Sequence, residues 1–351
     1  MSYILITLTL LSGDYTNLRK ASVSELLAGH YLQAEVLART AIESAGANDD
    51  QYGEALSYSD LGDALLAQAR FLEAEREYRK AISILNQQSG SSHAAAIVWR
   101  NLASDLTAQA QYGEAKAALK RAATLISKDR IQDPELSTEI LNSLGVVQFD
   151  EGDIDKAERS FTRATLLPCD SNPLRNGGRW EILANLGRVF QIRHQMAKAE
   201  EAYSQSLQLA EQKLSAGHPA TARLHDNLGS LYTELGRFSE AEKHFQLSLA
   251  ILQNANMPGD DPTRMHTLYE LARTYVGDHQ EARAEPLLAQ ATTIARKHAA
   301  AGDLPEIAEI LDMYSKVLKD LSNASEAEHL QSEARRVRAA MAFTVPVGSL
   351  R

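Results

Sequence analysis

One pattern of small and large side chains recurs eight times along this 351-residue chain, at intervals of 40 to 43 residues. The pattern is anchored on an alanine, which occurs at Ala34, Ala74, Ala115, Ala157, Ala199, Ala241, Ala284 and Ala327. Seven positions after this anchor alanine the residue is again small. Twelve positions before it stand Ser22, Gly62, Ala103, Gly145, Gly187, Gly229, Ala272 and Ser315. A fixed period of this length is typical of repeat proteins that stack one supersecondary unit on the next.

The repeated unit reads as a pair of antiparallel helices. Small side chains at two fixed places let helix backbones approach closely, and the larger residue between them, such as Tyr78 or Phe161, fills the neighbouring groove. The 53 alanines and 47 leucines make up more than a quarter of the chain, and both are strong helix formers. Gly29, Gly152 and Gly236 lie in the expected turn inside a pair, where a left-handed residue ends the first helix. We therefore expect an all-α protein.

The pattern resembles the tetratricopeptide repeat, which runs leucine–glycine, then tyrosine, then alanine, aromatic and alanine. The segment from Gly217 to Ile251, GHPATARLHDNLGSLYTELGRFSEAEKHFQLSLAI, carries the pattern most fully, and the longer period resembles the kinesin light chain type of repeat. The resemblance covers about residues 17–340 and implies a right-handed α-α superhelix, or solenoid, of about eight helix–turn–helix units. It leaves an apolar segment at 1–16 and a tail at 341–351.

The chain departs from the family pattern at both ends and at several turns. Ala21 and Ser22 replace leucine–glycine in the first unit, and Tyr314, Ser315 and Gln331 occupy template positions in the last. The end units of a solenoid face water, so atypical residues are expected there. The turn glycine is replaced by Ala69, Ala110, His194, His279 and Ser322. These turns are expected to be less regular.

The start of the chain raises a targeting question, because residues Ile4 to Leu11 are apolar. A secretory signal needs a positive segment before its apolar run, and a spanning helix needs about 20 apolar residues. No Lys or Arg precedes this run, so the favoured interpretation is a first helix that covers the open end of the fold. A degenerate or clipped signal peptide and membrane attachment are the alternatives. We expect a cytoplasmic protein, or an exported one if the run is a degenerate signal peptide.

Residues typical of catalysis or metal binding are not gathered into a motif. The ten histidines show no HExxH spacing, and neither a glycine-rich nucleotide loop nor GxSxG occurs. The single Cys169 rules out an intramolecular disulfide and is expected to be a free surface thiol. A formal charge of −10 disfavours broad nucleic-acid binding. We expect a non-catalytic protein with no cofactor, no metal, and neither nucleic acid nor membrane as partner.

In the resembled family the first helices line a concave groove that binds peptides, and an asparagine just before the leucine–glycine pair contacts the peptide backbone. The matching positions hold Asn101, Asn185 and Asn227, which the resemblance places in a peptide-binding groove. An amide suits this task because it donates and accepts hydrogen bonds at once. The alternative is that these asparagines only bridge neighbouring helices.

Four arginines are expected on the same face, within one helical turn of the asparagine register. They are Arg100, Arg188, Arg223 and Arg273. The planar guanidinium fork matches carboxylates, which favours a partner with acidic groups. Acidic residues share this face by register, so internal salt bridges explain the arginines equally well. These acidic residues are Glu139, Glu181, Asp226 and Glu234.

Among the aromatic residues, Tyr269 is the expected contact on the groove face. Tyr232 and Tyr275 occupy the packing register and are expected in the core. The sequence thus predicts a protein–protein interaction scaffold that binds a partner peptide or segment in the concave groove. The alternative is a peptide-sensing regulatory protein whose superhelix changes shape on ligand binding.

Overall fold

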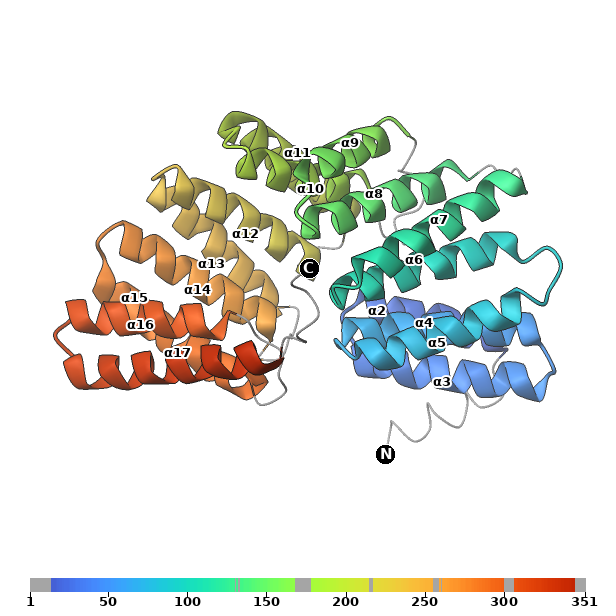
Figure 1. Ribbon diagram of the computed structural model, residues 1–351, viewed down its shortest axis with the longest axis horizontal. Coiled ribbons are helices and arrows are strands. Elements are labelled where there is room, and N and C mark those ends of the chain that lie inside the picture. Colours follow the sequence, from blue (N-terminus) through green and yellow to red (C-terminus); the bar gives the residue numbers. More distant parts are fainter. Residues whose placement is uncertain are drawn as a thin grey trace. The chain divides into compact units, whose positions relative to one another are not determined.

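The computed structural model describes residues 14–129, 131, 133–167, 178–214, 217–254, 259, 261–299 and 306–344 (Figure 1). Within these residues sixteen helices follow one another and no strand occurs. The first helices of the repeated units are α2 (Tyr15–Leu27), α4 (Gln51–Ala67), α6 (Ser92–Ala108), α8 (Pro134–Asp150), α10 (Arg179–Ile192), α12 (Pro219–Glu234), α14 (Pro262–Gly277) and α16 (Ile307–Asp320). The second helices are α3 (Tyr31–Ala47), α5 (Phe71–Leu85), α7 (Tyr112–Lys128), α9 (Ile154–Thr165), α11 (Met196–Lys213), α13 (Phe238–Asn254), α15 (Glu281–Ala299) and α17 (Ala324–Thr344). The expected all-α solenoid class is confirmed. The apolar run Ile4 to Leu11 and Cys169 lie outside the described residues.

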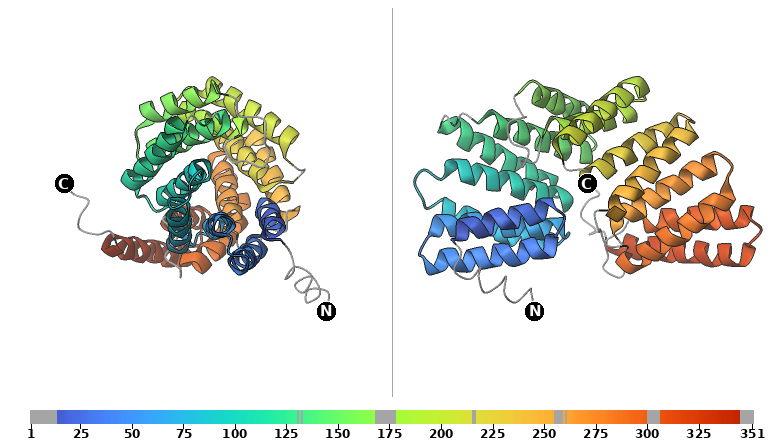
Figure 2. Two further views of the ribbon diagram at one scale, coloured as in Figure 1. Left: turned by 90° about the vertical axis from the view of Figure 1, so that its right-hand side faces the viewer. Right: turned by 180° about the vertical axis from the view of Figure 1, so that it is seen from behind.

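The chain divides into two compact units, Met1–Arg193 and His194–Arg351. Within each of them, successive first helices contact one another, and most second helices pack against the first helix of their own pair and that of the next pair. Figure 2 shows this stacking, pair upon pair, from two further directions. Each pair leaves an apolar face that only the following pair covers, which is why a repeat of this kind folds as a stack.

Glycines on first helices receive the aromatic rings of second helices. The pairs are Gly62 with Tyr78, Gly145 with Phe161 and Gly229 with Phe245. A Cβ added to these glycines would lie 2.6, 2.5 and 2.7 Å from the nearest ring atom. The three rings are fully buried, and burying a large apolar side chain contributes roughly 1.5–3 kcal/mol. The small residue on the first helix and the large residue on the second helix of each of these pairs therefore contact each other.

The turns inside the pairs are more uniform than expected from the sequence. Gly29, Gly152 and Gly236 have φ of 83°, 89° and 70°, in the left-handed region. The residues that replace glycine adopt the same region, with φ of 57° at Ala69, 56° at Ala110, 55° at His194, 56° at His279 and 65° at Ser322. The prediction of less regular turns is wrong. Packing of the two helices holds these residues in a conformation that costs an L-residue about 1–2 kcal/mol.

Two first helices, α8 and α14, begin with an aspartate cap followed by a proline. Asp133 accepts a hydrogen bond from the Leu136 amide at 2.8 Å, and Asp261 accepts one from the Thr263 amide at 2.8 Å. Each aspartate precedes a proline at the first helical position, where a missing N–H is tolerated. Before Pro219 the sequence offers no acidic or amide cap. There the His218 ring nitrogen Nδ1 accepts from the Ala220 amide at 3.1 Å, which fixes that nitrogen as unprotonated.

Candidate functional site

The amides of Asn101 and Asn185 are hydrogen-bonded to the preceding first helix. Asn101 Nδ2 donates to Asp63 Oδ1 at 2.9 Å, which joins α6 to α4. Asn185 Nδ2 donates to Asn142 Oδ1 at 3.0 Å, which joins α10 to α8. These two predicted groove residues, both in the compact unit Met1–Arg193, therefore bridge neighbouring helices.

Arg100 is also held within the N-terminal unit. Its Nη2 lies 3.0 Å from Glu139 Oε2, so the guanidinium joins α6 to α8. The Arg100 side chain is only 12% exposed and that of Glu139 only 4%. This ion pair is the internal salt bridge that the sequence offered as an alternative, and it leaves Arg100 little surface for a ligand.

Two carboxylates of α4, Asp60 and Asp63, accept hydrogen bonds from side chains of other helices. Asp60 is buried and receives Arg19 Nε at 2.6 Å. Asp63 Oδ1 accepts from the Tyr78 hydroxyl at 2.7 Å as well as from Asn101. Burial raises the pKa of Asp63 to about 7, and the nearby Asp60 adds to the rise, although the hydrogen bond from Tyr78 opposes it. Asp63 therefore holds its proton far better than an exposed aspartate.

Arg188 differs from Arg100 because it is exposed. Its guanidinium carbon lies 4.3 Å from the centre of the Phe149 ring, a cation–π contact between α10 and α8. Burial raises the pKa of Asp150, and the charge of Arg188 partly offsets that rise. Arg188 is the one predicted groove residue that remains accessible on the described first helices of the N-terminal unit.

The four other predicted residues lie together in the C-terminal unit. Arg223 and Asn227 occupy one face of α12, and Tyr269 and Arg273 occupy one face of α14. Arg273 Nη2 donates to Ser230 Oγ at 3.2 Å, and Ser230 follows Asn227 by one turn of α12. This contact brings the two helix faces side by side. We call the surface formed by these four residues the α12–α14 face.

The four residues of the α12–α14 face differ in exposure and in the hydrogen bonds and ion pairs that they make within the protein. Arg223 is exposed and Asn227 is half-buried, and neither has a hydrogen bond or ion pair within the described part of the chain. Arg273 Nη2 lies 2.6 Å from Glu270 Oε2 and keeps about a third of its side chain exposed. Tyr269 is half-buried, and burial and then the charge of Glu270 raise its pKa. Arg223 and Asn227 are thus the most available groups.

Buried contacts hold the two helices of this face in register. Thr267 Oγ1 donates to Asp226 Oδ2 at 2.9 Å, and the hydroxyls of Thr233 and Thr274 lie 2.7 Å apart. Burial raises the pKa of Asp226 to about 6, while hydrogen bonds from Ser248 and Thr267 lower it. Hydrogen bonds between buried side chains therefore join α12 to α14 beneath this surface.

Tyr232 and Tyr275 belong to the core, as the sequence predicts. They are only 8% and 5% exposed. Arg237 lies 4.2 Å from the centre of the Tyr232 ring, and Arg283 lies 4.0 Å from that of Tyr275. These rings lie beside a second kind of polar contact, which joins neighbouring helix pairs and was not predicted from the sequence.

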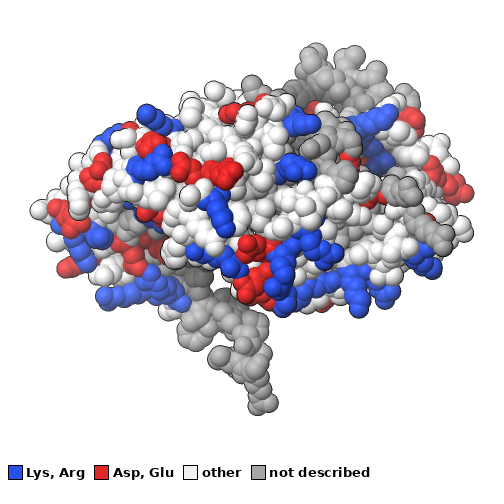
Figure 3. All heavy atoms as spheres, turned by 90° about the horizontal axis from the view of Figure 1, so that it is seen from above, with Lys and Arg blue, Asp and Glu red and all other residues white. Residues whose placement is uncertain are grey.

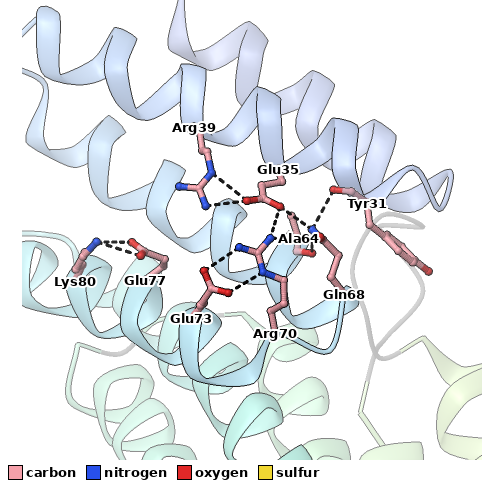
Figure 4. Close-up of polar contacts among 9 residues, drawn as sticks. All are labelled: Tyr31, Glu35, Arg39, Ala64, Gln68, Arg70, Glu73, Glu77 and Lys80. Atoms are coloured by element: carbon pink, nitrogen blue, oxygen red, sulfur yellow. Dashed lines mark hydrogen bonds and ion pairs between the residues drawn. The ribbon is translucent and has the colours of Figure 1, made fainter. Parts of the chain in front are cut away.

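That contact is made by the residue directly after the anchor alanine. In the first unit this residue is Glu35, which accepts hydrogen bonds from Gln68 at 3.0 Å and Arg70 at 2.6 Å (Figure 4). Arg39 approaches the same carboxylate at 2.7 Å from its own helix. Burial alone would raise the pKa of Glu35, but these hydrogen bonds and the charge of Arg70 lower it. Glu35 therefore ties α3 to the end of α4 and the turn that follows.

The same position makes the same kind of contact at later junctions. Glu200 receives Arg237 at 2.9 Å and the Tyr232 hydroxyl at 3.0 Å, and Glu242 receives Arg283 at 2.6 Å. We call these the junction carboxylates. The recurrence of an acidic residue there was the available signal, at Glu35, Glu75, Glu158, Glu200, Glu242, Glu285 and Glu328. On the face drawn in Figure 3 acidic and basic side chains lie intermixed, in keeping with such pairing.

A pair of histidines joins α12 to α13. The Nδ1 atoms of His225 and His244 lie 2.9 Å apart, so one ring donates its N–H and the other accepts. Burial lowers the pKa of His225 to about 4, and the charge of His244 adds to the effect. Burial also lowers the pKa of His244, against the charge of Glu240. Both rings are therefore held neutral at pH 7.

Among the described residues, no group of three or more His, Cys, Asp and Glu side chains is arranged to hold a metal ion. The same residues include no helix whose length and apolar character would let it cross a membrane.

A sequence profile described as tetratricopeptide repeat matches residues 53–128 and 181–254, which coincide with α4–α7 and α10–α13. The matched residues carry the glycine–aromatic contacts of Gly62 with Tyr78 and Gly229 with Phe245. These two stretches are tetratricopeptide repeats. No curated protein matches the sequence.

Several solved structures share the fold of this chain at low sequence identity. The Rap conjugation gene regulator of the plasmid pLS20, solved with the Phr* peptide, is 16% identical with a TM-score of 0.62, over 82% of this chain and 75% of that one. A signal transduction ATPase of Pyrococcus horikoshii with a tetratricopeptide repeat sensor is 11% identical with a TM-score of 0.61, over 94% and 48%. The Cut9 and Hcn1 hetero-tetramer structure is 16% identical with a TM-score of 0.58, over 86% and 55%. The chain thus spans about half the length of the last two.

Proposed function

We propose that this protein is a non-catalytic interaction scaffold that binds an extended segment of a partner protein on the α12–α14 face. The observation that carries the proposal is the state of Asn227. It occupies the same register as Asn101 and Asn185, yet within the described residues its amide has no hydrogen-bond partner. A half-buried amide of this kind can pair with a peptide group, because it donates one hydrogen bond and accepts another.

The neighbours of Asn227 favour acidic side chains on the bound segment. Arg223 is exposed one turn away on α12 without a carboxylate partner in the described residues, and Arg273 keeps part of its guanidinium exposed beside Glu270. A free guanidinium binds a carboxylate through two parallel hydrogen bonds. Tyr269 adds a half-buried ring that can contact an apolar part of the segment. A backbone-binding amide flanked by cations and a ring suits an extended acidic segment.

The proposal is tested with peptides selected from a random displayed library on the purified full-length protein. Their dissociation constants are then measured by fluorescence anisotropy for wild type and for Arg223→Ala/Asn227→Ala. We expect the double variant to bind roughly tenfold more weakly, because two polar contacts to the ligand are lost. The matched control, Lys243→Ala/Asn254→Ala, removes one exposed cation and one exposed amide from α13. Equal affinity of wild type and the α12 double variant would show that the ligand binds elsewhere.

A second candidate function is peptide sensing, in which binding changes the arrangement of the chain. Two observations favour it. The chain divides at residues 193 and 194 into two compact units, and the Rap regulator that shares its fold was solved with a bound peptide. Small-angle scattering with and without a selected peptide distinguishes the two functions. A sensor changes its radius of gyration on binding, whereas a passive scaffold keeps it.

A further inference from the structure

The last helix pair carries a hollow that is lined mainly by cations. The hollow has a volume of about 300 Å³ and lies between α16 and α17. Its lining residues are Asp312, Ser315, Lys316 and Lys319 of α16 and Gln331, Arg335 and Arg338 of α17. Residues spaced by three, four or seven positions lie on one face of a helix, so each set forms a single face. We call this space the α16–α17 hollow.

The α17 residues of the hollow stand where other units carry core residues. The positions four, eight and eleven residues after the anchor alanine hold Tyr78, Ile82 and Leu85 in α5, and all three are buried. In α17 the same positions hold Gln331, Arg335 and Arg338. No later helix covers this face within the described residues, so polar side chains are expected there. That requirement does not explain why they are cationic in a chain with a net charge of −10.

Most of these cations have no carboxylate partner among the residues that the structure describes. Arg338 pairs with Asp312, and Lys319 Nζ makes only a long hydrogen bond of 3.4 Å to Gln331. Lys316 and Arg335 are exposed and have neither a hydrogen bond nor an ion pair within the described part of the chain. Four cations and one carboxylate leave a formal charge of +3 around the hollow.

Two other arginines of the same compact unit are neutralised by partners. Arg283 lies 2.6 Å from Glu242, and Arg296 lies 2.6 Å from Glu333. Like charges held close together repel, so an unpaired cluster reduces stability unless an anion binds. The α16–α17 hollow is therefore suited to a ligand group that carries more than one negative charge.

We propose that the α16–α17 hollow binds a phosphoryl group on a serine or threonine of the partner protein, an inference that rests on the proposed function. A phosphoryl group carries close to two negative charges at pH 7 and three strong acceptor oxygens. The Arg335 guanidinium offers a fork to two of these oxygens, and Lys316 and Lys319 offer ammonium donors from the facing helix. A single carboxylate would leave most of the excess charge uncompensated.

The exposure of the cations indicates the source of the phosphoryl group. Exposed charges bind a free anion weakly at physiological salt, because water and counterions screen them. A phosphorylated side chain on a polypeptide adds the contacts of its flanking residues and so binds more tightly than the free anion. The hollow is open at the protein surface, which leaves room for those residues on either side.

The test compares three degenerate peptide libraries that carry phosphoserine, serine or glutamate at one central position. Binding to the full-length protein is measured by fluorescence anisotropy at 150 mM salt, a condition chosen to screen weak contacts. We expect the phosphoserine library to bind about tenfold more tightly than the serine library, in line with a few charge-assisted hydrogen bonds. Lys316→Ala/Arg335→Ala should abolish that difference.

The matched control is Arg336→Ala, which removes an adjacent exposed cation that does not line the hollow and should keep the full preference. Equal binding of the phosphoserine and glutamate libraries would overturn the phosphoryl assignment. So would an unchanged preference in Lys316→Ala/Arg335→Ala. Competition by inorganic phosphate at the same concentration as the peptide would assign the hollow to the free anion instead.

One more variant distinguishes the contribution of the α12–α14 face to binding from that of the hollow. Arg223→Ala/Asn227→Ala should weaken all three libraries alike and keep the ratio between phosphoserine and serine. If the phosphoserine and serine libraries bind with equal affinity while that variant still weakens binding, only the inference about the hollow is overturned. If the variant leaves binding unchanged while the phosphoserine preference persists, the proposed function of the α12–α14 face is wrong instead.

Discussion

The ammonium nitrogen of Lys116 lies 2.7 Å from a carboxylate oxygen of Glu151, and this ion pair reverses the charges of the junction that follows it. Lys116 occupies the position of the junction carboxylates, directly after its anchor alanine. At the preceding junction Glu75 accepts from Gln109 at 3.4 Å, and at the following one Glu158 pairs with Arg193 at 3.2 Å. Complementarity across the junction is therefore kept while the signs are exchanged.

The first prediction tests this complementarity by exchanging the charges. Lys116→Glu and Glu151→Lys each place like charges at the junction and should lower the free energy of unfolding by about 0.5 kcal/mol, the scale of exposed ion pairs. The double variant should recover most of the loss, because the pair is restored in the orientation of its neighbours. Urea unfolding followed by circular dichroism measures all three variants. Additive losses in the double variant would contradict a direct interaction.

The second prediction concerns the glycine beneath the Phe161 ring. Gly145→Ala puts a Cβ 2.5 Å from a ring carbon, so the ring or the helices must shift, at a loss of about 1–3 kcal/mol. Gly113→Ala in α7 is the matched control, because no atom lies within 4 Å of its added Cβ. That variant should gain about 0.5–1 kcal/mol, since alanine favours a helix over glycine. The opposite signs are checked by urea unfolding, and equal effects would contradict the close packing.

The third prediction concerns the turn residues that replace glycine. Ala110 has a φ of 56°, so Ala110→Gly should stabilise the protein by about 1 kcal/mol by removing left-handed strain. The control Ala108→Gly lies two residues earlier, at the end of α6, where glycine should destabilise by about 0.5–1 kcal/mol. Both sites are exposed, so no packing is lost. Thermal unfolding should therefore show shifts of opposite direction, and a lower stability of Ala110→Gly would contradict the strain.

The fourth prediction is a pH dependence that arises from Asp63. Its pKa is raised by burial from 3.8 to about 7, so between these values the folded state binds more protons than the unfolded state. Stability should then fall as the pH rises through this window and level off above it. Asp63→Asn keeps the Oδ1 acceptor of Tyr78 and Asn101 but has no charge.

At pH 8 the Asp63→Asn variant should be more stable than wild type, by on the order of 1 kcal/mol, with a smaller gain at pH 5. Part of the slope should remain, because burial also raises the pKa of Asp105 to about 6. Asp320→Asn, at an exposed site on α16, is the control and should follow the wild-type profile. Urea unfolding from pH 4 to 9 measures these profiles. A gain that does not depend on pH would show that charge is not the cause.

The fifth prediction concerns acid stability at the His225–His244 pair. The pKa of His225 lies near 4 in the folded state and near 6.5 in the unfolded state, so the unfolded state binds more protons in this range. Stability should fall as the pH decreases from 6.5 to 4, because two protonated rings lose their hydrogen bond and repel. Hydrogen exchange of α12 and α13 amides measures this locally.

Replacing both rings, as in His225→Leu/His244→Leu, should reduce the loss of local stability at low pH that hydrogen exchange of the α12 and α13 amides reports. His266→Gln at an exposed position of α14 is the control and should leave it in place. An unchanged acid dependence in the double leucine variant would assign the effect to another group, such as Glu240, whose pKa is lowered by the hydrogen bond from Arg237.

The sequence predicted the fold because the repeat reports directly on packing. A glycine or alanine recurs where two helices must approach, and the large residue that fills the space recurs on the partner helix, as Gly229 and Phe245 show. Tyr232 and Tyr275 were placed in the core by the same register. The turn conformation was misjudged at Ala69 and its equivalents, since local preference for glycine is weaker than the packing of two helices.

The candidate site was predicted only in part. Register alone put Asn101, Asn185 and Asn227 at equivalent places, but the partners of the first two amides lie about forty residues away on another helix. Asp63 and Asn142 accept from the first two, while Asn227 has no partner among the described residues. Likewise Glu139 makes Arg100 a structural residue, whereas no acidic side chain of the described residues engages Arg223.

By itself, the sequence determined the period, the helix pairs and the residues that face the core, because these follow from side-chain size and from contacts that every unit repeats. Only the tertiary structure decided which polar groups are paired between neighbouring helices and which have no partner among the described residues. A hydrogen bond between units depends on which side chain the neighbouring unit presents at one particular place, and that differs from junction to junction. The repeat is regular in its apolar contacts and variable in its polar ones, so polar groups without a partner among the described residues, such as Asn227, occur at particular places only.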